Sequence, residues 1–465
     1  MTTEISRRRL LARGTAMSLG LIGLSRVGCV SGRTATTGSP DGIGYGPTLT
    51  DPEGIFDLPS GFSYKIIGRT GQLLDDGLLL AGQPDGAAAF PDAEGRTVLI
   101  LNHELLPDQS EKSPFGKNNQ WLNRIDPRLL YDRGYGTTPG IGGCSRFVLN
   151  PQTNEVIRRE YAILGTERNC AGGPTPWNSW ITCEETVTRR GDVAEVDHGY
   201  CFEVPADQSG LVEPRPLYDM GRFNHEAVCI NPHTGVVYLT EDRSDGAIYR
   251  LLPERPGELT AGGRLQALVV RDTASMDTRN WMKGDSTSSH RTVINEPMPV
   301  SWIDVENTHA PKDDLRYQVY AKGAARFARA EGMWWGHDSA YFACTSGGPD
   351  RLGQVFRYHP SRQEATPDEE HEPGMLELFI EPKDHRLVEM ADNLTVGPTG
   401  DLFLCEDGSG RDGIAGVTTA GEVYRFAENR LSQSELAGVC FSPDSDTMFV
   451  SLQSDGLTLA VTGPW

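Results

Sequence analysis

Residues 231–250 read Asn-Pro-His-Thr-Gly-Val-Val-Tyr-Leu-Thr-Glu-Asp-Arg-Ser-Asp-Gly-Ala-Ile-Tyr-Arg and contain a unit that recurs along the chain. The unit begins with a turn rich in Asn, Pro and Gly and continues as an apolar, β-branched strand. An acidic loop then leads into a second strand of the form Gly-x-Ile-Tyr-Arg. Similar second strands start at Gly353 and Gly421. The irregular spacing of these units is typical of antiparallel sheets joined by loops of variable length.

Few segments have the periodicity of an amphipathic helix, so we predict an all-β protein. Repeated antiparallel sheets in one chain favour a β-propeller, and we expect about six blades. Pro-rich and polar stretches at 272–299 and 361–373 are predicted to be long loop insertions. Because the unit occurs on both sides of each insertion, a single propeller domain over residues 46–465 explains the chain better than two domains.

The N-terminus has the pattern of an export signal. Ser6-Arg7-Arg8-Arg9 precedes an apolar stretch at 14–24, which is shorter than the about 20 apolar residues of a membrane-spanning helix. Residues 1–28 resemble a twin-arginine leader, so we predict passage through the twin-arginine export machinery to the periplasm or the extracellular space. The alternative is a basic start to a cytoplasmic protein.

A flexible tether is predicted after the leader, at residues 29–45, which are rich in Gly, Ser and Thr. Gly28-Cys29 is similar to the end of a lipoprotein cleavage site, although Arg26 stands where that pattern has an aliphatic residue. Lipid anchoring at Cys29 therefore stays an alternative to a free, exported protein.

The chain is acidic, because 64 Asp and Glu against 43 Lys and Arg give a formal net charge of −21. This excess of negative charge argues against nucleic acid or an anionic membrane as the main partner. The charge does not indicate an oligomeric state. The nine cysteines form no Cys-x-x-Cys pair, so a zinc ribbon is not expected. Several lie inside apolar strand patterns, and we expect most to be buried small side chains and not disulfides.

Acidic residues recur where predicted strands end. In a propeller these ends converge on one axis, where carboxylates can supply the about six to eight oxygens that calcium prefers. Each acid taken alone is equally well explained as a solvated loop residue, but the repeated position predicts a metal site. The acids in this position are Glu104, Glu185, Glu226, Glu241, Glu331, Glu406 and Asp407.

The stretch from Asn169 to Glu185 adds a thiol to these acids. It places Cys170 and the paired carboxylates Glu184 and Glu185 on either side of a turn rich in Gly, Pro and Trp. A thiolate is a soft ligand that calcium would not select, so its use in a site implies a transition metal such as iron. The alternative for Cys170 is a buried residue of a tight turn.

Arg329 is the candidate cation for substrate binding. It lies two residues before Glu331, so on a strand both side chains face the same side. A guanidinium beside a metal centre suits the oxygens of a phosphate group, because it is planar and always charged. The alternative is an ion pair at the surface.

These motifs resemble the PhoX-type alkaline phosphatases, which are exported enzymes with a six-bladed propeller and a mixed iron–calcium centre. The resemblance covers most of the mature chain. It rests on Asn169-Cys-Ala-Gly-Gly through Thr182-Cys-Glu-Glu185, Gly221-Arg-Phe-Asn-His-Glu226, Arg329-Ala-Glu331, Asp392-Asn-Leu394, Glu406-Asp407-Gly408, Cys440-Phe-Ser-Pro-Asp444 and Phe449-Val-Ser-Leu-Gln453.

The resemblance implies a phosphoric monoester hydrolase that acts on small phosphate esters with Fe3+ and Ca2+. It implies that Cys170 binds iron and that Arg329 holds the phosphoryl group. Glu185 or Glu184, with Glu226 and Glu331, would bind iron or calcium, and Asp392 and Asn393 would add further oxygens. Two other classes stay open: a calcium-dependent propeller lactonase or phosphotriesterase, and a non-catalytic propeller stabilised by calcium.

Overall fold

The computed structural model describes residues 42–191, 193–282 and 291–465. The predicted leader, and the predicted tether as far as residue 41, lie outside these residues. Within the described ranges the regular secondary structure is almost entirely β-strand, with one α-helix, α1 (Leu315–Ala321), and several short 3-10 turns. No helix in this part of the chain is long and apolar enough to cross a membrane. The all-β prediction is confirmed.

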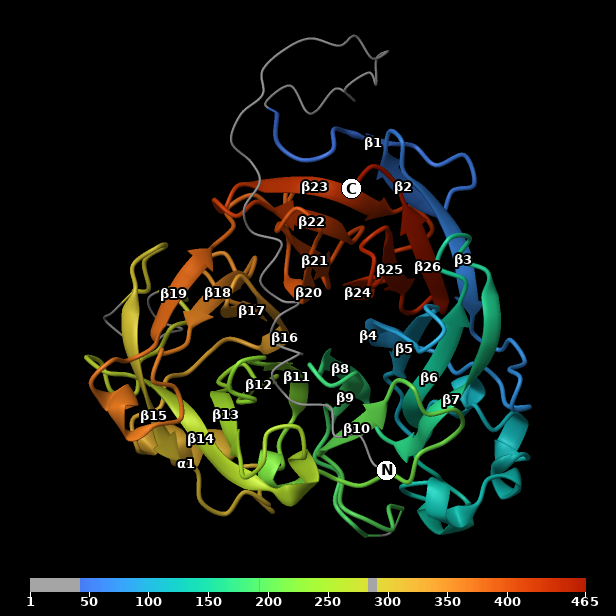
Figure 1. The fold of residues 1–465 in the computed structure, drawn as a ribbon, viewed down its shortest axis with the longest axis horizontal. Coiled ribbons are helices and arrows are strands. Elements are labelled where there is room, and N and C mark those ends of the chain that lie inside the picture. The colour runs from blue at the N-terminus through green and yellow to red at the C-terminus, as the bar shows by residue number, and fades with distance from the viewer. Residues whose placement is uncertain (1–41, 192, 283–290) are drawn as a thin grey trace, which may run out of the picture. The chain divides into compact units, whose positions relative to one another are not determined.

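Five antiparallel sheets surround a common centre (Figure 1). The first contains β4 (Pro84–Pro91), β5 (Thr97–His103), β6 (Gly142–Leu149) and β7 (Val156–Thr166). The second contains β8 (Asn169–Pro174), β9 (Ser179–Glu184) and β10 (Cys201–Pro205). The third has nine strands: β11 (His225–Ile230), β12 (Val237–Glu241), β13 (Ile248–Pro253), β14 (Gly263–Val270), β15 (Met298–Asp304), β19 (Met375–Ile380), β18 (Gln354–His359), β17 (Ser339–Cys344) and β16 (Ala330–Gly336).

The two remaining sheets contain strands from both ends of the described chain. One contains β20 (Ala391–Val396), β21 (Leu402–Glu406), β22 (Gly413–Val417), β23 (Val423–Asn429), β2 (Phe56–Pro59) and β1 (Thr48–Leu49). The other contains β24 (Leu436–Phe441), β25 (Thr447–Leu452), β26 (Leu457–Thr462) and β3 (Ser63–Arg69). Pairing of β3 with β26 closes the structure.

The arrangement is a β-propeller, as predicted. The innermost strands β4, β8, β11, β16, β20 and β24 contact one another in a closed ring (Figure 1). The nine-stranded sheet consists of two four-stranded meanders, β11–β14 and β16–β19, which β15 joins by pairing with both β14 and β19. Because this joint merges neighbouring units into one sheet, the number of blades stays a prediction.

Apolar side chains fill the spaces between neighbouring sheets. Phe90 and Phe202 pack between the β4–β7 and β8–β10 sheets, and Phe403 and Val450 pack between the β20–β23 and β24–β26 strands. Full burial of each such side chain stabilises the fold by about 1.5–3 kcal/mol. The core is therefore distributed around the molecule, and the start of each inner strand is available for polar side chains.

Each inner strand begins with a break in register against the next strand. The breaks follow Pro84, Asn169, His225, Ala330, Ala391 and Ala437. An extra residue at such a bulge bends the strand and changes the direction of its side chain. The residues that follow the break are Asp85, Cys170, Glu226, Glu331, Asp392 and Gly438. All of these residues except Gly438 have a side chain that could bind a metal.

In four of these bulges a glycine or alanine comes next, and the inner strands approach closely there. A Cβ on Gly86 would lie 2.6 Å from the Cα of Ala171, and a Cβ on Gly332 would lie 2.5 Å from the carbonyl oxygen of Asp392. Both distances are too short for any larger residue. At Asp85-Gly86 and Glu331-Gly332, the close approach of neighbouring inner strands thus requires a glycine after the acid.

Candidate metal centre

Acidic side chains and one thiol gather at the start of the inner strands. Four groups have ligand atoms that lie within 4.8 Å of one another. They are Asp85–Glu104–Cys170, Cys170–Glu185–Glu226, Glu226–Glu331–Asp392 and Asp392–Asp407–Glu435. Because Cys170, Glu226 and Asp392 each belong to two groups, the four groups form one continuous run of donors.

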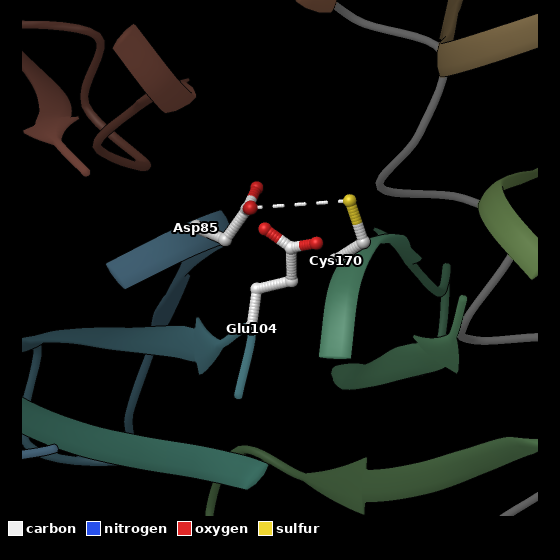
Figure 2. A group of neighbouring side chains, drawn as sticks. All are labelled: Asp85, Glu104 and Cys170. Atoms are coloured by element: carbon white, nitrogen blue, oxygen red, sulfur yellow. Dashed lines mark hydrogen bonds between the residues drawn. The ribbon is translucent and has the colours of Figure 1, made fainter. Parts of the chain in front are cut away.

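Cys170 lies between two of these groups. Its Sγ is 3.2 Å from Glu226 Oε1 and 3.8 Å from Asp85 Oδ2. Figure 2 shows Asp85 on β4, Glu104 just beyond β5 and Cys170 on β8 converging on one point. The side-chain amide of Asn102 donates to the carbonyl oxygens of Cys170 and Ala171 and so fixes the bulge. The tight-turn alternative does not explain why the sulfur faces two carboxylates.

Buried oxygens in this run lack hydrogen-bond donors. Asp85 Oδ1 and Glu226 Oε2 are buried with no partner. Burial, and then the charges of neighbouring acids, raise the pKa of both carboxyls well above the ordinary value. The same causes raise the pKa of Asp392 to about 7 and that of Glu435 to about 11. So many acids ionise together only beside a compensating cation, and these residues therefore fit a polyvalent metal centre.

Two arginines stand in matching positions beside these donors. Arg168 and Arg329 each lie two residues before an inner-strand donor, Cys170 and Glu331, and both have left-handed backbones, with φ of 46° and 52°. A non-glycine residue adopts this conformation at a cost, which is commonly seen at functional sites. Their side chains are 34% and 29% exposed. Both guanidiniums can therefore contact the solvent side of the donors.

Each arginine forms ion pairs with at least two acids, and Arg329 also lies 3.8 Å from Asp407. Arg168 pairs with Glu104 and, at 2.6 Å, with Glu185. Arg329 pairs with Glu331 and, at 3.1 Å, with Asp242. A guanidinium keeps its charge under these conditions, so an incoming anion would meet two fixed cations next to the acidic groups.

Glu184 and Glu406 are not part of the run of donors. Glu184 Oε1 is 2.6 Å from His198 Nδ1, and its Oε2 accepts from the backbone of Gly199 at 2.8 Å. Glu406 pairs with Arg425 and accepts from the backbone of Glu389 and Gly413. Glu241 likewise binds Arg316 and Tyr249. These acids end β9, β21 and β12, and their carboxylates are already fully bonded within the sheets.

Asn393 also has a local role. Its Nδ2 donates to Asp392 Oδ1 at 3.0 Å, and its Oδ1 accepts from the backbone of Gly438 at 2.8 Å. It therefore links two neighbouring inner strands and holds Asp392 in place. The remaining predicted residues are brought together, and Arg329 contacts them. They are Cys170, Glu104, Glu185, Glu226, Glu331, Asp392 and Asp407.

Sequence reasoning missed several residues of the centre. They are Asp85, Arg168, Asp242, Glu435 and Gln453, whose amide donates to Asp85 Oδ2 at 2.9 Å and to Glu104 Oε2 at 2.8 Å. Two signals could have found some of them. Asp85-Gly86 repeats the acid-then-small pattern of Glu331-Gly332, and the spacing of Arg168 to Cys170 repeats that of Arg329 to Glu331.

The fold and donors define a propeller with a central cluster of residues that could hold metal ions. A family model described as alkaline phosphatase PhoX matches residues 43–127 and 143–456. The chain belongs to the PhoX family of alkaline phosphatases, which are metal-dependent hydrolases. No curated protein sequence matches it.

Two solved structures are similar to this chain. Pseudomonas fluorescens PhoX, in complex with vanadate as a transition-state analogue, is similar with a TM-score of 0.63 and 17% identity, over 90% of this chain and 97% of that one. A gluconolactonase from Xanthomonas campestris has a TM-score of 0.40 and 12% identity, over 91% and 99% of the two chains. The first of these comparisons confirms the propeller fold.

Proposed function

We propose that this protein hydrolyses small phosphomonoesters, as an alkaline phosphatase, at a centre of iron and calcium. The observation that carries the proposal is the donor set, in which one buried thiol shares its surroundings with carboxylates on both sides. A site for calcium alone would not need the sulfur. Membership of the PhoX family supports the same reaction class.

The donors divide by chemistry along the run. The two groups that contain Cys170 offer a soft ligand, which suits iron. The groups Glu226–Glu331–Asp392 and Asp392–Asp407–Glu435 offer oxygen alone, which suits calcium. Bound metals would stabilise the charge that develops on the phosphoryl group during its transfer.

Arg329 and Arg168 are the residues that we assign to phosphate binding. Their guanidiniums can each donate two hydrogen bonds to oxygens of a phosphoryl group and fix its orientation. Their ion pairs with Glu185 and Asp242 hold both side chains in place before substrate arrives. Vanadate bound to Pseudomonas fluorescens PhoX supports the binding of a phosphate-like oxyanion in this family.

The test measures metal content and turnover on the same samples. The parent protein should contain iron and calcium and should hydrolyse a chromogenic phosphomonoester at alkaline pH. Arg329→Lys and Arg168→Lys should each lower kcat/KM by about 10²–10³-fold, because the planar fork is lost, while metal content is kept. Arg386→Lys is the matched control, since Arg386 is an exposed partner of Asp384.

Other outcomes would identify a different class. A fully metallated parent with no phosphatase activity would contradict the proposal. Calcium without iron would favour a propeller lactonase or phosphotriesterase. Loss of stability after chelation, in a protein with no turnover beforehand, would favour a non-catalytic propeller.

We also propose export through the twin-arginine machinery. The arginines at 7 and 8 and the short apolar stretch after them support this location. A protein that binds its metals while folding would need a route for folded proteins. Fractionation of cells that express the chain measures export. The control is the variant with both arginines replaced by lysine, which should stay in the cytoplasm.

A further inference from the structure

Two buried thiols face each other on neighbouring strands of the second sheet. Cys183 on β9 and Cys201 on β10 are directly paired, and their Sγ atoms are 3.5 Å apart. Both side chains are fully buried. The site described above uses neither sulfur, and the spacing of the cysteines in the sequence does not single them out.

The register of β9 against β10 places these cysteines directly opposite each other, in a non-hydrogen-bonded pair. The backbone N–H of Glu184 donates to the carbonyl of Tyr200 at 3.0 Å, so Glu184 and Tyr200 form a hydrogen-bonded pair. Hydrogen-bonded and non-hydrogen-bonded pairs alternate along antiparallel strands. Cys183 and Cys201 are therefore a non-hydrogen-bonded pair.

A second contact supports this register. The carbonyl of Cys201 accepts from the N–H of Leu217 at 2.9 Å and so points away from β9. In a non-hydrogen-bonded pair the Cα atoms are about 4.5 Å apart. This spacing lies within the roughly 4.4–6.8 Å that disulfides span, so a bond would need rotation of the side chains and little backbone movement.

We propose that Cys183 and Cys201 form a disulfide in the oxidised protein. A low-molecular-weight disulfide, or a disulfide-donor protein, would be the oxidant. Thiol–disulfide exchange would form one S–S bond between the two cysteines and break the S–S bond of the oxidant. The oxidant would leave as two thiols, which carry the two protons and two electrons of the cysteines.

Access to the sulfurs comes from the position of β10. It is the terminal strand of its three-stranded sheet, where β9 lies between β10 and β8. On its other side the segment around Pro216 and Leu217 adds a single bridge to Phe202 and the bond to Cys201. Opening of a terminal strand exposes few neighbours and costs less than opening a central one. The oxidant can therefore reach the thiols without unfolding of the whole propeller.

The bond would connect the two ends of a loop that lies beside the metal centre. Cys183 directly precedes Glu184 and Glu185, and Cys201 Sγ is 3.3 Å from the ring of His225, which precedes Glu226. Oxidation would thus fix residues 184–200 at both ends and hold Glu185 in position. This inference is independent of the phosphatase reaction.

The test compares the full-length protein after treatment with oxidised glutathione and after treatment with dithiothreitol. Both samples are denatured and alkylated, and the mass of the intact protein is measured by mass spectrometry. The oxidised parent should carry two fewer alkyl groups, and its peptide map should contain a cross-link between Cys183 and Cys201. Cys183→Ala and Cys201→Ala should abolish the difference.

Cys144→Ala provides the matched control, because the buried thiol of Cys144 donates to Asn102 and not to sulfur. This variant should still lose two alkyl groups on oxidation. Equal alkylation of the oxidised and reduced parent would overturn the proposal, as would a cross-link between other cysteines or a glutathione adduct on either one. The peptide map of the parent gives the answer even if a variant fails to fold.

Discussion

Glu184 and Glu185 are adjacent and both buried, yet their surroundings are opposite. Glu184 is surrounded by donors, because His198 and backbone N–H groups of the following loop occupy both of its oxygens. Glu185 faces other acids, and its pKa is raised well above the ordinary value by burial, although Arg168 opposes the shift. Burial alone therefore does not distinguish an acid that holds the fold from one that holds a metal.

The same contrast recurs in two other sheets. Glu241 and Glu406 end their strands and bind Arg316 and Arg425 away from the donor groups. The next residues, Asp242 and Asp407, instead pair with Arg329 beside the donors. Successive side chains on a strand point in opposite directions, so one step along the chain moves a carboxylate from the sheet interior to the metal centre. The number of donors already bonded to an acid, and not its depth, indicates its role.

The largest expected effect is loss of activity in Glu185→Gln. Changes to groups that only orient a metal ligand cost about 10–100-fold, so loss of a ligand charge should lower activity by at least about 100-fold. Metal content should fall with activity. The free energy of unfolding of the metal-free protein should change little, since burial and neighbouring acids already raise the pKa of Glu185 well above its ordinary value, although Arg168 opposes the shift. A metallated and active Glu185→Gln protein would remove Glu185 from the centre.

Glu184→Gln should have the reverse outcome. Burial by itself lowers the pKa of His198, but the charges of Glu184, Asp132 and Glu167 outweigh burial and raise it to about 10. Without the negative charge of Glu184, the buried imidazolium of His198 keeps only the weaker stabilisation by the other acids. This should lower the free energy of unfolding by about 3–5 kcal/mol. Urea denaturation measures this loss.

The folded fraction of Glu184→Gln should keep its metals, which analysis of the purified, folded protein checks. Glu406→Gln, next to Arg425, should behave in the same way. Loss of metal with unchanged stability in either variant would place that carboxylate at the centre after all. The distinction between an acid that stabilises the fold and a neighbouring acid that binds metal would then be wrong.

The sequence predicted the class of fold because turns and β-branched strands leave local patterns. Pairing of β3 with β26 has no such pattern, since the two strands come from opposite ends of the described chain. The acids at strand ends were found, but Glu184 could not be separated from Glu185 without the register of β9. Asp85 was missed because an isolated acid at the start of a strand is ordinary until the ring of inner strands is known.

The smallest expected effect is a difference in pH dependence between the metal-free and the metal-loaded protein. In the metal-free protein, burial and the charge of Asp407 raise the pKa of Asp392 to about 7. In the unfolded chain the carboxyl of Asp392 releases its proton at about pH 4. The folded protein therefore holds more protons between about pH 4 and pH 7, and the free energy of unfolding decreases as pH rises through this window.

Metal binding should remove most of this decrease, because bound carboxylates are already ionised in the folded protein. The ion pair of Glu184 with His198 should add a decrease of its own from about pH 6 upward, with or without metal, because an unfolded histidine loses its proton at about pH 6.5. The folded imidazolium stays charged until about pH 10, so only the metal-dependent part of the decrease reports on the acids of the centre. Urea midpoints at pH 5, 6 and 7, with and without a chelator, measure the difference. If the metal-free protein became more stable from pH 5 to pH 7, Asp392 and the other acids of the donor groups would be ionised without a cation. Glu185 would then not differ from Glu184 in its need for a positive partner.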